Sequence, residues 1–507
     1  MKLFKDPIDR SSILTIVALA VAIALVLSQG DRTLPQVKDF SWQGKTIGVE
    51  DTAFILTFNR PMERESVEKN LQINPYLPGK MSWAGRRMAY TPMQPAPYGN
   101  TYAVKLEGAR EKYYGGGEGK LIKPFQGFFN SRDRALVYIG LTGEEKGRLM
   151  LVNFEAIEPK PIALTPSNLA VMDFKFYPLG DRLLFSALER KTVLPSLSEQ
   201  QLFTVTTGIN PVAPGEKPKP PEEAGQVELI LDNKDYQNLK FDLSPDGKTI
   251  VVQRVKREDT SDSAPWIIEE GKKARYLTDK EGKVQQGGDF LIAPDSKSIV
   301  LLQGQGISIL PLNAETDFSE DLMFLPKFGR VLSFARDGSR ATMVKYNTDG
   351  ARSLYIVTNQ GEEKEIFKTA PYGNILEAKF DPTKTVLYCL LSRVLEDEEE
   401  YEEELYIAKL NLKTNELKTL IILPNQREVE MSLSPDGLAL LFDQTVTQTI
   451  NNNSGEDSQG NGEAEAIATS SRIWLLPLIS DTPTDANQVE VQPEQLPFAG
   501  FSPRWLP

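Results

Sequence analysis

The chain has 507 residues, a net charge of −13 and no histidine. This length exceeds one ordinary hydrophobic core, so two or three domains are expected. The absence of histidine excludes Ser-His-Asp and Cys-His catalysis and every histidine-containing zinc site. The acidic balance argues against a nucleic-acid-binding face, and against an anionic membrane surface as the main partner.

The only cysteine, Cys389, lies in the apolar run TVLYCLL. One cysteine cannot form an intramolecular disulfide, and its neighbours predict a small buried hydrophobic residue rather than a reactive thiol. Carboxylate, lysine or tyrosine chemistry is what remains for an enzyme. The sequence singles out no catalytic, cofactor-binding or metal-binding residue.

An apolar segment lies near the N-terminus. Residues 11–30 carry no charge, and twenty such residues cross a hydrocarbon core of ~30 Å as a helix. Basic residues outnumber acidic ones in residues 1–10, so this end is expected in the cytoplasm and the body on the periplasmic side. A cleaved signal peptide is the alternative, because Ile13–Leu27 is short for a span. An uncleaved anchor is favoured, because no clear cleavage site precedes Asp31.

Residues 31–132 change to a pattern of short strands. AFILTFNRPM (Ala53–Met62) predicts a strand that a proline ends. Tyr102, Val104 and Leu106 alternate with polar residues, as in a half-buried strand. Several short strands in about 95 residues indicate a β-sandwich.

Three stretches of this segment resemble the bacterial Ig-like domain first described in surface-layer proteins. They are FNRPMERESVEKN, YTPMQPAPYGNTYAVKLEGA and PFQGFFNS. The shared pattern is a strand ending in F-N-x-P-M, then S-V, then Y-x-P followed by G-x-x-Y, and it covers nearly the whole segment. The resemblance implies a spacer or adhesive module and carries no catalytic residue.

One motif recurs through residues 133–507. LSPDGKTIVV (Leu243–Val252) and LSPDGLALLF (Leu433–Phe442) are nearly alike, and looser copies bring the total to seven. The turn positions of the copies are Asp181, Asp246, Asp295, Asp337, Thr383, Asp436 and Arg504. Proline fixes φ at the first corner of a type I turn, and glycine accepts the left-handed conformation that completes the hairpin. The aspartates are therefore interpreted as turn residues and not as catalytic ones.

Each repeat predicts about four strands, and sheets this small bury both faces only when they are stacked radially. SPDG, LSPDG and FSPRW, with LYIV and LYIA downstream, resemble the TolB-type β-propeller repeat over residues 134–507. Seven copies predict seven blades, with six or eight as alternatives. The last strand, in AGFSPRWLP, is expected to complete the first blade, RALVYIGL, and so to remove free edges. The resemblance implies a periplasmic protein that binds partners.

Two segments interrupt the repeat. Residues 449–471 are of low complexity and are predicted to be disordered. The acidic run at residues 396–404 predicts a solvated hairpin tip, with a site for a divalent cation or a basic partner as the alternative.

Together these features predict an all-β envelope protein with a membrane anchor at 11–30, an Ig-like domain at 31–132 and a propeller at 133–507. The leading hypothesis is a non-catalytic platform on which a propeller face docks a protein or an envelope glycan, with no cofactor and no nucleic acid. A glycan-active enzyme with paired carboxylates is the alternative. Two acids about 5 to 10 Å apart in a concave channel would favour the enzyme. A channel of mixed polar residues beside an exposed apolar patch would favour docking.

Overall fold

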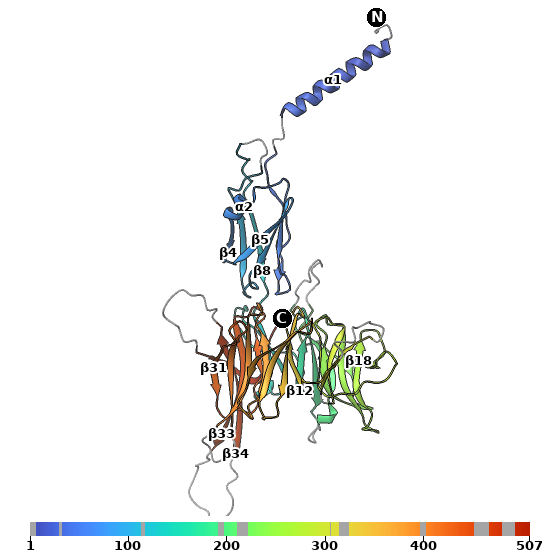
Figure 1. Cartoon of the computed structure of the whole chain (residues 1–507), viewed down its shortest axis with the longest axis vertical. Helices are drawn as coiled ribbons and strands as arrows, with labels where there is room; N and C mark the ends of the chain where they lie inside the picture. Colours follow the sequence, from blue (N-terminus) through green and yellow to red (C-terminus); the bar gives the residue numbers. More distant parts are fainter. Residues whose placement is uncertain are drawn as a thin grey trace, which may run out of the picture. The chain divides into compact units, whose positions relative to one another are not determined.

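The structure is a computed structural model of the chain, drawn in Figure 1. It describes residues 7–29, 33–112, 117–190, 197–209, 222–304, 306–313, 324–395, 402–450, 466–478 and 492–507. The chain divides into two compact units. Unit 1 comprises residues 1–44, 53–91 and 101–129, and unit 2 comprises residues 45–52, 92–100 and 130–507.

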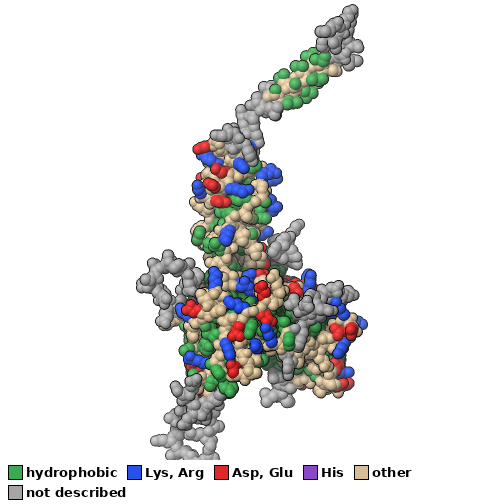
Figure 2. Space-filling view, in the orientation of Figure 1, with side chains coloured by type: hydrophobic (Ala, Val, Ile, Leu, Met, Phe, Trp, Pro, Cys, Tyr) green, Lys and Arg blue, Asp and Glu red, His purple; other side chains and the backbone are tan. Residues whose placement is uncertain are grey.

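A long helix, α1 (Pro7–Gln29), begins the described chain. Its apolar side chains are exposed: Leu14 is 70% and Ile16 is 64% exposed, and Figure 2 shows them along the helix. In the part of the chain that the structure describes, no helix is long and apolar enough to cross a membrane. The transmembrane anchor at residues 11–30 stays a prediction from the sequence.

Two four-stranded sheets and a short helix, α2 (Arg64–Asn70), follow. The first sheet has the order β1 (Val37–Phe40), β3 (Phe54–Phe58), β6 (Arg87–Pro92), β5 (Gly79–Ala84). The second sheet has the order β2 (Thr46–Ile47), β8 (Phe125–Ser131), β7 (Thr101–Leu106), β4 (Leu71–Asn74).

Aromatic side chains pack between these two sheets. The Phe129 ring of β8 lies 5.0 Å from Trp42 and 4.9 Å from Tyr102, measured between ring centroids. The Phe54 ring of β3 lies 5.3 Å from the same Trp42 ring and 5.2 Å from Phe40. The alternation of these rings with polar residues along each strand explains why one face of each sheet is buried.

The described part of unit 2 consists mainly of five four-stranded sheets and one seven-stranded sheet, and β35 divides the latter into two parts. We call the resulting seven parts blades 1 to 7. Blade 1 holds β9 (Ala135–Gly140), β10 (Leu149–Asn153), β11 (Ile162–Ala163) and the end of β35 (Glu494–Trp505). Blade 2 holds β12 (Leu169–Phe176), β13 (Arg182–Glu189), β14 (Gln201–Thr206) and β15 (Val227–Leu231). Blade 3 holds β16 (Tyr236–Leu243), β17 (Thr249–Lys256), β18 (Ser263–Glu269) and β19 (Arg275–Tyr276).

The remaining blades repeat this order. Blade 4 holds β20 (Phe290–Ile292), β21 (Ser298–Gln303), β22 (Gly306–Pro311) and β23 (Phe324–Leu325). Blade 5 holds β24 (Arg330–Phe334), β25 (Arg340–Tyr346), β26 (Arg352–Thr358) and β27 (Glu363–Lys368). Blade 6 holds β28 (Ile375–Phe380), β29 (Val386–Val394), β30 (Glu403–Asn411) and β31 (Leu417–Leu423). Blade 7 holds β32 (Met431–Leu433), β33 (Ala439–Ile450), β34 (Ala466–Pro477) and the start of β35.

Apolar clusters lie between successive blades, and one of them joins blade 7 back to blade 1. Side chains on a strand alternate between its two faces, so each buried strand contributes to two clusters. On β13, Leu183 packs toward blade 1 and Leu184 toward blade 3. On β25, Met343 packs toward blade 4 and Val344 toward blade 6. Because both faces of these strands are buried, the apolar runs of the repeat are continuous. The fold is a β-propeller.

Strand β35 closes the ring. Its first half pairs with β34 of blade 7, with Ala499 opposite Arg472. Its second half pairs with β9 of blade 1, with Trp505 opposite Leu136. The prediction that the last strand completes the first blade is confirmed. Because β35 pairs with both β34 and β9, the junction of blades 7 and 1 leaves neither of these strands with an unpaired edge there.

The repeated turns have the predicted geometry. The Gly247 N–H donates to the Ser244 carbonyl oxygen over 2.8 Å, and the φ of Gly247 is +72°. The Asp246 carboxylate accepts from the Lys248 N–H and from the Ser244 hydroxyl, which makes it a turn residue. Asp436 repeats both interactions with Leu438 and Ser434.

The prediction for the seventh copy was wrong in one respect. Arg504 was expected at a turn position, but it lies inside β35 and pairs with Val137. Tryptophan follows Arg504 where the other copies carry a small or polar residue, and the partner strand β9 is available for pairing. This segment therefore continues as a strand.

The predicted disordered segment, residues 449–471, begins and ends inside a hairpin. Thr449 pairs with Ile467 and Ile450 with Ala466, so its two flanks belong to strands β33 and β34. The β-branched run TVTQTI favours this extended pairing over disorder. Residues 451–465 lie outside the described residues, as do residues 396–401 of the acidic run.

Candidate functional site

Charged side chains lie on or next to the innermost strand of each blade. This is the first strand in blades 2 to 7 and the end of β35 in blade 1. We call this set the axial charge ring: Asp173, Lys175, Lys240, Asp242, Asp289, Arg330, Glu377, Lys379, Glu430 and Arg504. It contains five acids and five bases, so its net charge is zero at neutral pH. Most of these side chains are partly exposed, so the ring is accessible to water.

Ion pairs of this ring join neighbouring blades. The Lys175 ammonium of blade 2 lies 3.3 Å from the Asp242 carboxylate of blade 3. The Asp289 carboxylate, just before β20, contacts the Lys240 ammonium of blade 3 and lies 4.0 Å from the Arg330 guanidinium of blade 5. The innermost strands are therefore connected by charge as well as by apolar packing.

Arg504 links three blades where the ring closes. One guanidinium nitrogen lies 2.8 Å from Asp173 Oδ1 of blade 2 and 3.0 Å from Glu430 Oε2, next to β32 of blade 7. The guanidinium also lies 4.6 Å from the centre of the Phe174 ring and donates to the Phe174 carbonyl oxygen. The two carboxylates raise the pKa of Arg504 above its usual range despite burial.

Among the bases of the axial charge ring, Lys240 has the pKa that departs furthest from its ordinary value. Burial, together with the neighbouring cations Lys175 and Arg330, lowers the pKa of Lys240 to about 8, while Asp242 acts in the opposite direction. A lysine in this range is mostly protonated at neutral pH. It therefore serves as a cation in the ring rather than as a free amine nucleophile.

Asp443, on β33, is a buried carboxyl group beside the ring. Its oxygens accept hydrogen bonds from the N–H groups of Glu430 and Ser502, each over 2.8 Å. Burial raises the pKa of Asp443 to about 6, the two backbone donors lower it, and the nearby Glu430 raises it. With 6% of its surface exposed, Asp443 ties β32 and β35 to β33 rather than facing solvent.

A glycan-active enzyme would need a pair of acids in the ring suited to glycoside chemistry. Asp173 and Glu430 are the best candidates, since both lie within 3.0 Å of the same Arg504 nitrogen. A glycosidase needs the space between its two carboxyl groups for the sugar and a water molecule. The Arg504 guanidinium occupies that space.

The acidic run 396–404 contributes only its end to the described structure. The Glu403 carboxylate accepts from the Asn374 amide over 2.9 Å and from the Ser392 hydroxyl. The Glu404 carboxylate pairs with Arg393 at 2.6 Å. Within the described ranges, no group of three or more Cys, Asp or Glu side chains is placed to hold a metal ion.

Residues 92–100 of unit 2 contact the turns at one end of the ring. The Tyr98 N–H donates to Asp436 Oδ2 over 3.0 Å, in the turn of blade 7. Gln94 lines a cavity of about 260 Å³ together with Pro382 in the turn of blade 6. Burial raises the pKa of Tyr98 to about 12. This segment therefore covers part of the turn end of the propeller.

Residues 45–52 of unit 2 also contact the turn end of the propeller. Glu50 forms an ion pair with Arg132, whose guanidinium also donates to the Pro507 carbonyl oxygen over 3.2 Å. The Arg132 side chain is only 6% exposed. Two segments of the chain itself thus contact part of the turn end.

Four of the inner strands carry a repeated irregularity within the strand, several residues before the turn. In blades 2, 3, 5 and 6 the register shifts by one residue before the turn, which is a β-bulge. The extra residues are all apolar: Met172, Leu239, Leu332 and Leu376. Met172 is 38% and Leu239 is 49% exposed. We call these four residues the bulge set.

Neither the axial charge ring nor the bulge set was predicted from the sequence. A signal for the ring exists: in FKF, FDL and AKF a charged residue stands between apolar ones just before the turn, at Lys175, Asp242 and Lys379. Such a residue on an inner strand faces away from the inter-blade cores. The bulge residues carry no comparable signal, because they continue an apolar run.

The similarity of this chain to known proteins is low. No protein-family model matches the sequence, and no curated protein is significantly similar to it. Among solved structures, TolB from Acinetobacter baumannii is 10% identical, with a TM-score of 0.38 over 86% of this chain and 83% of that chain. An oligogalacturonate lyase from Vibrio parahaemolyticus is 11% identical, with a TM-score of 0.42 over 59% and 80%. A putative 6-phosphogluconolactonase from Bacteroides fragilis is 12% identical, with a TM-score of 0.42 over 74% and 97%.

We expect Arg504→Gln to destabilise the propeller strongly. The substitution removes both ion pairs at the closure and leaves the carboxylates of Asp173 and Glu430 facing each other, which costs about 3 kcal/mol of unfolding free energy. Chemical denaturation of both proteins measures the difference. Arg427→Gln is the matched control, because Arg427 is exposed and the described residues offer it no ion-pair partner; an equal effect of the two substitutions would contradict the closing role of Arg504.

We expect the stability contributed by Asp443 to depend on pH. Its pKa is about 6 in the folded state against 3.8 for an ordinary aspartate, so the folded state binds the proton first as the pH falls. Stability relative to Asp443→Asn therefore rises between pH 7 and pH 4, by about 3 kcal/mol in the limit. Urea unfolding of both proteins across this range measures the difference. A difference that is constant with pH would show that Asp443 is ionised like an exposed carboxyl group.

Proposed function

We propose that this chain is a membrane-anchored, extracytoplasmic envelope protein whose propeller is a non-catalytic docking platform for a protein partner. The observation that carries the proposal is the pairing of every acid in the axial charge ring with a cation. Acid and base catalysis by carboxylates needs one group that is free to donate and one that is free to accept. The ring provides rigid, neutralised charge instead.

The proposed docking surface is the end of the ring opposite the turns, together with the bulge set on the inner strands. Residues 45–52 and 92–100 contact part of the turn end, which favours the other end for a partner. The exposed side chains of Met172 and Leu239 offer apolar contacts there, and the axial charge ring offers polar ones. An apolar patch bordered by polar groups is typical of protein-binding surfaces.

The anchor is supported by two observations. Residues 11–30 contain no charged side chain, and the described apolar side chains of α1 are exposed, for example Leu19 at 56%. A helix with apolar side chains all round requires an apolar environment. The basic excess in residues 1–10 favours the orientation with the body outside the cytoplasm.

Crosslinking in intact membranes tests the proposal. We expect the wild-type chain to recover one reproducible partner, and Leu239→Asp to reduce that recovery at least tenfold, because a charge in the apolar patch disrupts packing at the interface. Leu229→Asp is the matched control, since Leu229 is 50% exposed against 49% for Leu239 and lies on the outer strand β15.

Three other results would change the proposal. Equal recovery of the partner by Leu239→Asp and by the wild-type chain would show that the docking surface does not include the bulge set. Hydrolysis of an envelope glycan by the purified chain, with no protein partner recovered, would replace the platform with the enzyme. Binding of a glycan without hydrolysis would keep the platform and change the class of its partner.

A further inference from the structure

Charge is distributed unequally between the two units. Unit 1 contains 16 Lys and Arg against 10 Asp and Glu, a net charge of +6. Unit 2 contains 41 Lys and Arg against 60 Asp and Glu, a net charge of −19. The overall charge of −13 therefore conceals a basic unit. The negative charge of the whole chain therefore does not exclude an anionic membrane surface as a partner of unit 1.

Three basic residues of unit 1 lie around one cavity, which we call the cationic cleft. Its volume is about 480 Å³, and Lys38, Arg86 and Arg87 line it without any acidic residue. Lys38 lies on β1, and the two arginines lie at the turn between β5 and β6. All three are exposed, and in the described part of the chain no carboxylate pairs with any of them. Three uncompensated cations around one cavity favour an anionic ligand.

Hydrogen bonds fix the walls of the cationic cleft. The Arg86 guanidinium donates to the Asn59 carbonyl oxygen over 3.1 Å. The side chain of Asn59 accepts from the Gln36 N–H over 2.9 Å and donates to the Leu34 carbonyl oxygen over 3.1 Å. The cleft is therefore tied to the first residues of the domain.

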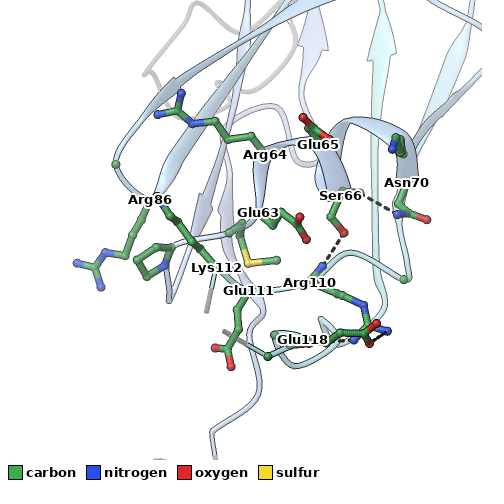
Figure 3. A pocket seen from close by; sticks show the side chains of 17 residues that line it. Glu63, Arg64, Glu65, Ser66, Asn70, Arg86, Arg110, Glu111, Lys112 and Glu118 are labelled. Carbon is green, nitrogen blue, oxygen red and sulfur yellow. Dashed lines mark hydrogen bonds and ion pairs between the residues drawn. The ribbon is translucent and has the colours of Figure 1, made fainter. Parts of the chain in front are cut away.

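A larger open cavity of about 1100 Å³ shares Arg86 with the cationic cleft. Figure 3 shows Arg86 and Arg64 extending outward from this cavity. Four acids line this larger cavity, and two of them are already engaged, since Glu111 pairs with Arg60 at 3.0 Å and Glu118 pairs with Arg110 at 2.9 Å. None of these four acids lines the cationic cleft itself.

The position of the cationic cleft in the chain indicates its ligand. Only four residues lie between Gln29, where α1 ends, and Leu34, and the five steps from one to the other span at most ~18 Å. A domain this close to a membrane helix reaches the headgroup region. Phosphate groups of anionic lipids attract basic side chains near the surface.

We propose that the cationic cleft binds the phosphate headgroups of anionic phospholipids in the membrane that holds α1. This inference rests on the membrane anchor of the proposed function. The attraction orients unit 1 on the membrane surface and is screened by salt, since a Debye length is about 8 Å at physiological ionic strength.

Fluorescence quenching in lipid nanodiscs tests the inference with the full chain. A fluorophore is placed on Ser82→Cys, because Ser82 is exposed on the same face of β5 as Ala84, which lines the cleft. The native Cys389 is buried and escapes labelling. The quencher is attached to lipid headgroups, and the discs contain phosphatidylcholine alone or with one third phosphatidylglycerol.

We expect quenching to be stronger in the discs with phosphatidylglycerol at low salt and to return to the phosphatidylcholine level at high salt. Replacing Lys38, Arg86 and Arg87 together by glutamine removes the difference, which corresponds to about a hundredfold change in the surface-bound population. The matched control replaces Lys105, Lys120 and Lys123 by glutamine, which changes the net charge equally away from the cleft and keeps most of the difference.

Three outcomes would overturn the inference. The first is equal quenching in both discs, and the second is an equal loss in the control variant. The third is association between copies that disappears with the cleft variant, which would assign the cleft to the acidic unit 2 of a second copy. Failure of the chain to insert into discs would contradict the anchor instead. Sedimentation with vesicles of the same two compositions would then still decide whether the cleft binds anionic lipid.

Discussion

The rest of the structure depends on apolar packing between neighbouring blades. Each buried strand contributes side chains to two inter-blade cores, one on each of its faces. Leu183 and Leu184 are neighbours in sequence, yet they belong to the cores on opposite sides of blade 2. Leu390 and Leu391 of blade 6 are divided in the same way. No blade contains a complete core, so a single blade is not stable alone. Stability requires every junction, including the one that β35 closes between blades 7 and 1.

Closure of the ring also determines where chemistry is available. The inner strands meet around one axis, and most of their charged residues pair between blades, whereas Glu377 and Lys379 pair within blade 6. Removing one partner of a buried ion pair costs more unfolding free energy than the intact pair contributes, so these charged side chains are committed to the structure of the ring. Binding is therefore expected at the ends of the ring, where side chains are not committed to closure. The basic unit 1 adds a second surface of a different kind, lined by Lys38, Arg86 and Arg87, for which we propose a phosphate ligand.

Much of this fold was predictable from the sequence, because local turn chemistry repeats. The Pro-Asp-Gly turns and the apolar runs after them predicted the blades, and Asp246 and Asp436 are turn residues as expected. The sequence could not show which charges meet, since Lys175 and Asp242 come together only when neighbouring blades pack. Arg504 was placed in a turn because its motif resembles the others, whereas strand pairing across the closure decided its conformation. The cationic cleft was hidden by the net charge of the whole chain.

Hydrogen exchange of the full chain, followed by mass spectrometry of its peptides, tests the closed ring most directly. We predict that the backbone N–H groups of β9 and β35 exchange as slowly as those of β17 and β29, which lie far from the closure. Slow exchange at all four strands would mean that the ring opens only when it unfolds as a whole. Fast exchange of β9 and β35, with β17 and β29 still protected, would show that blades 1 and 7 separate independently and would contradict the ring.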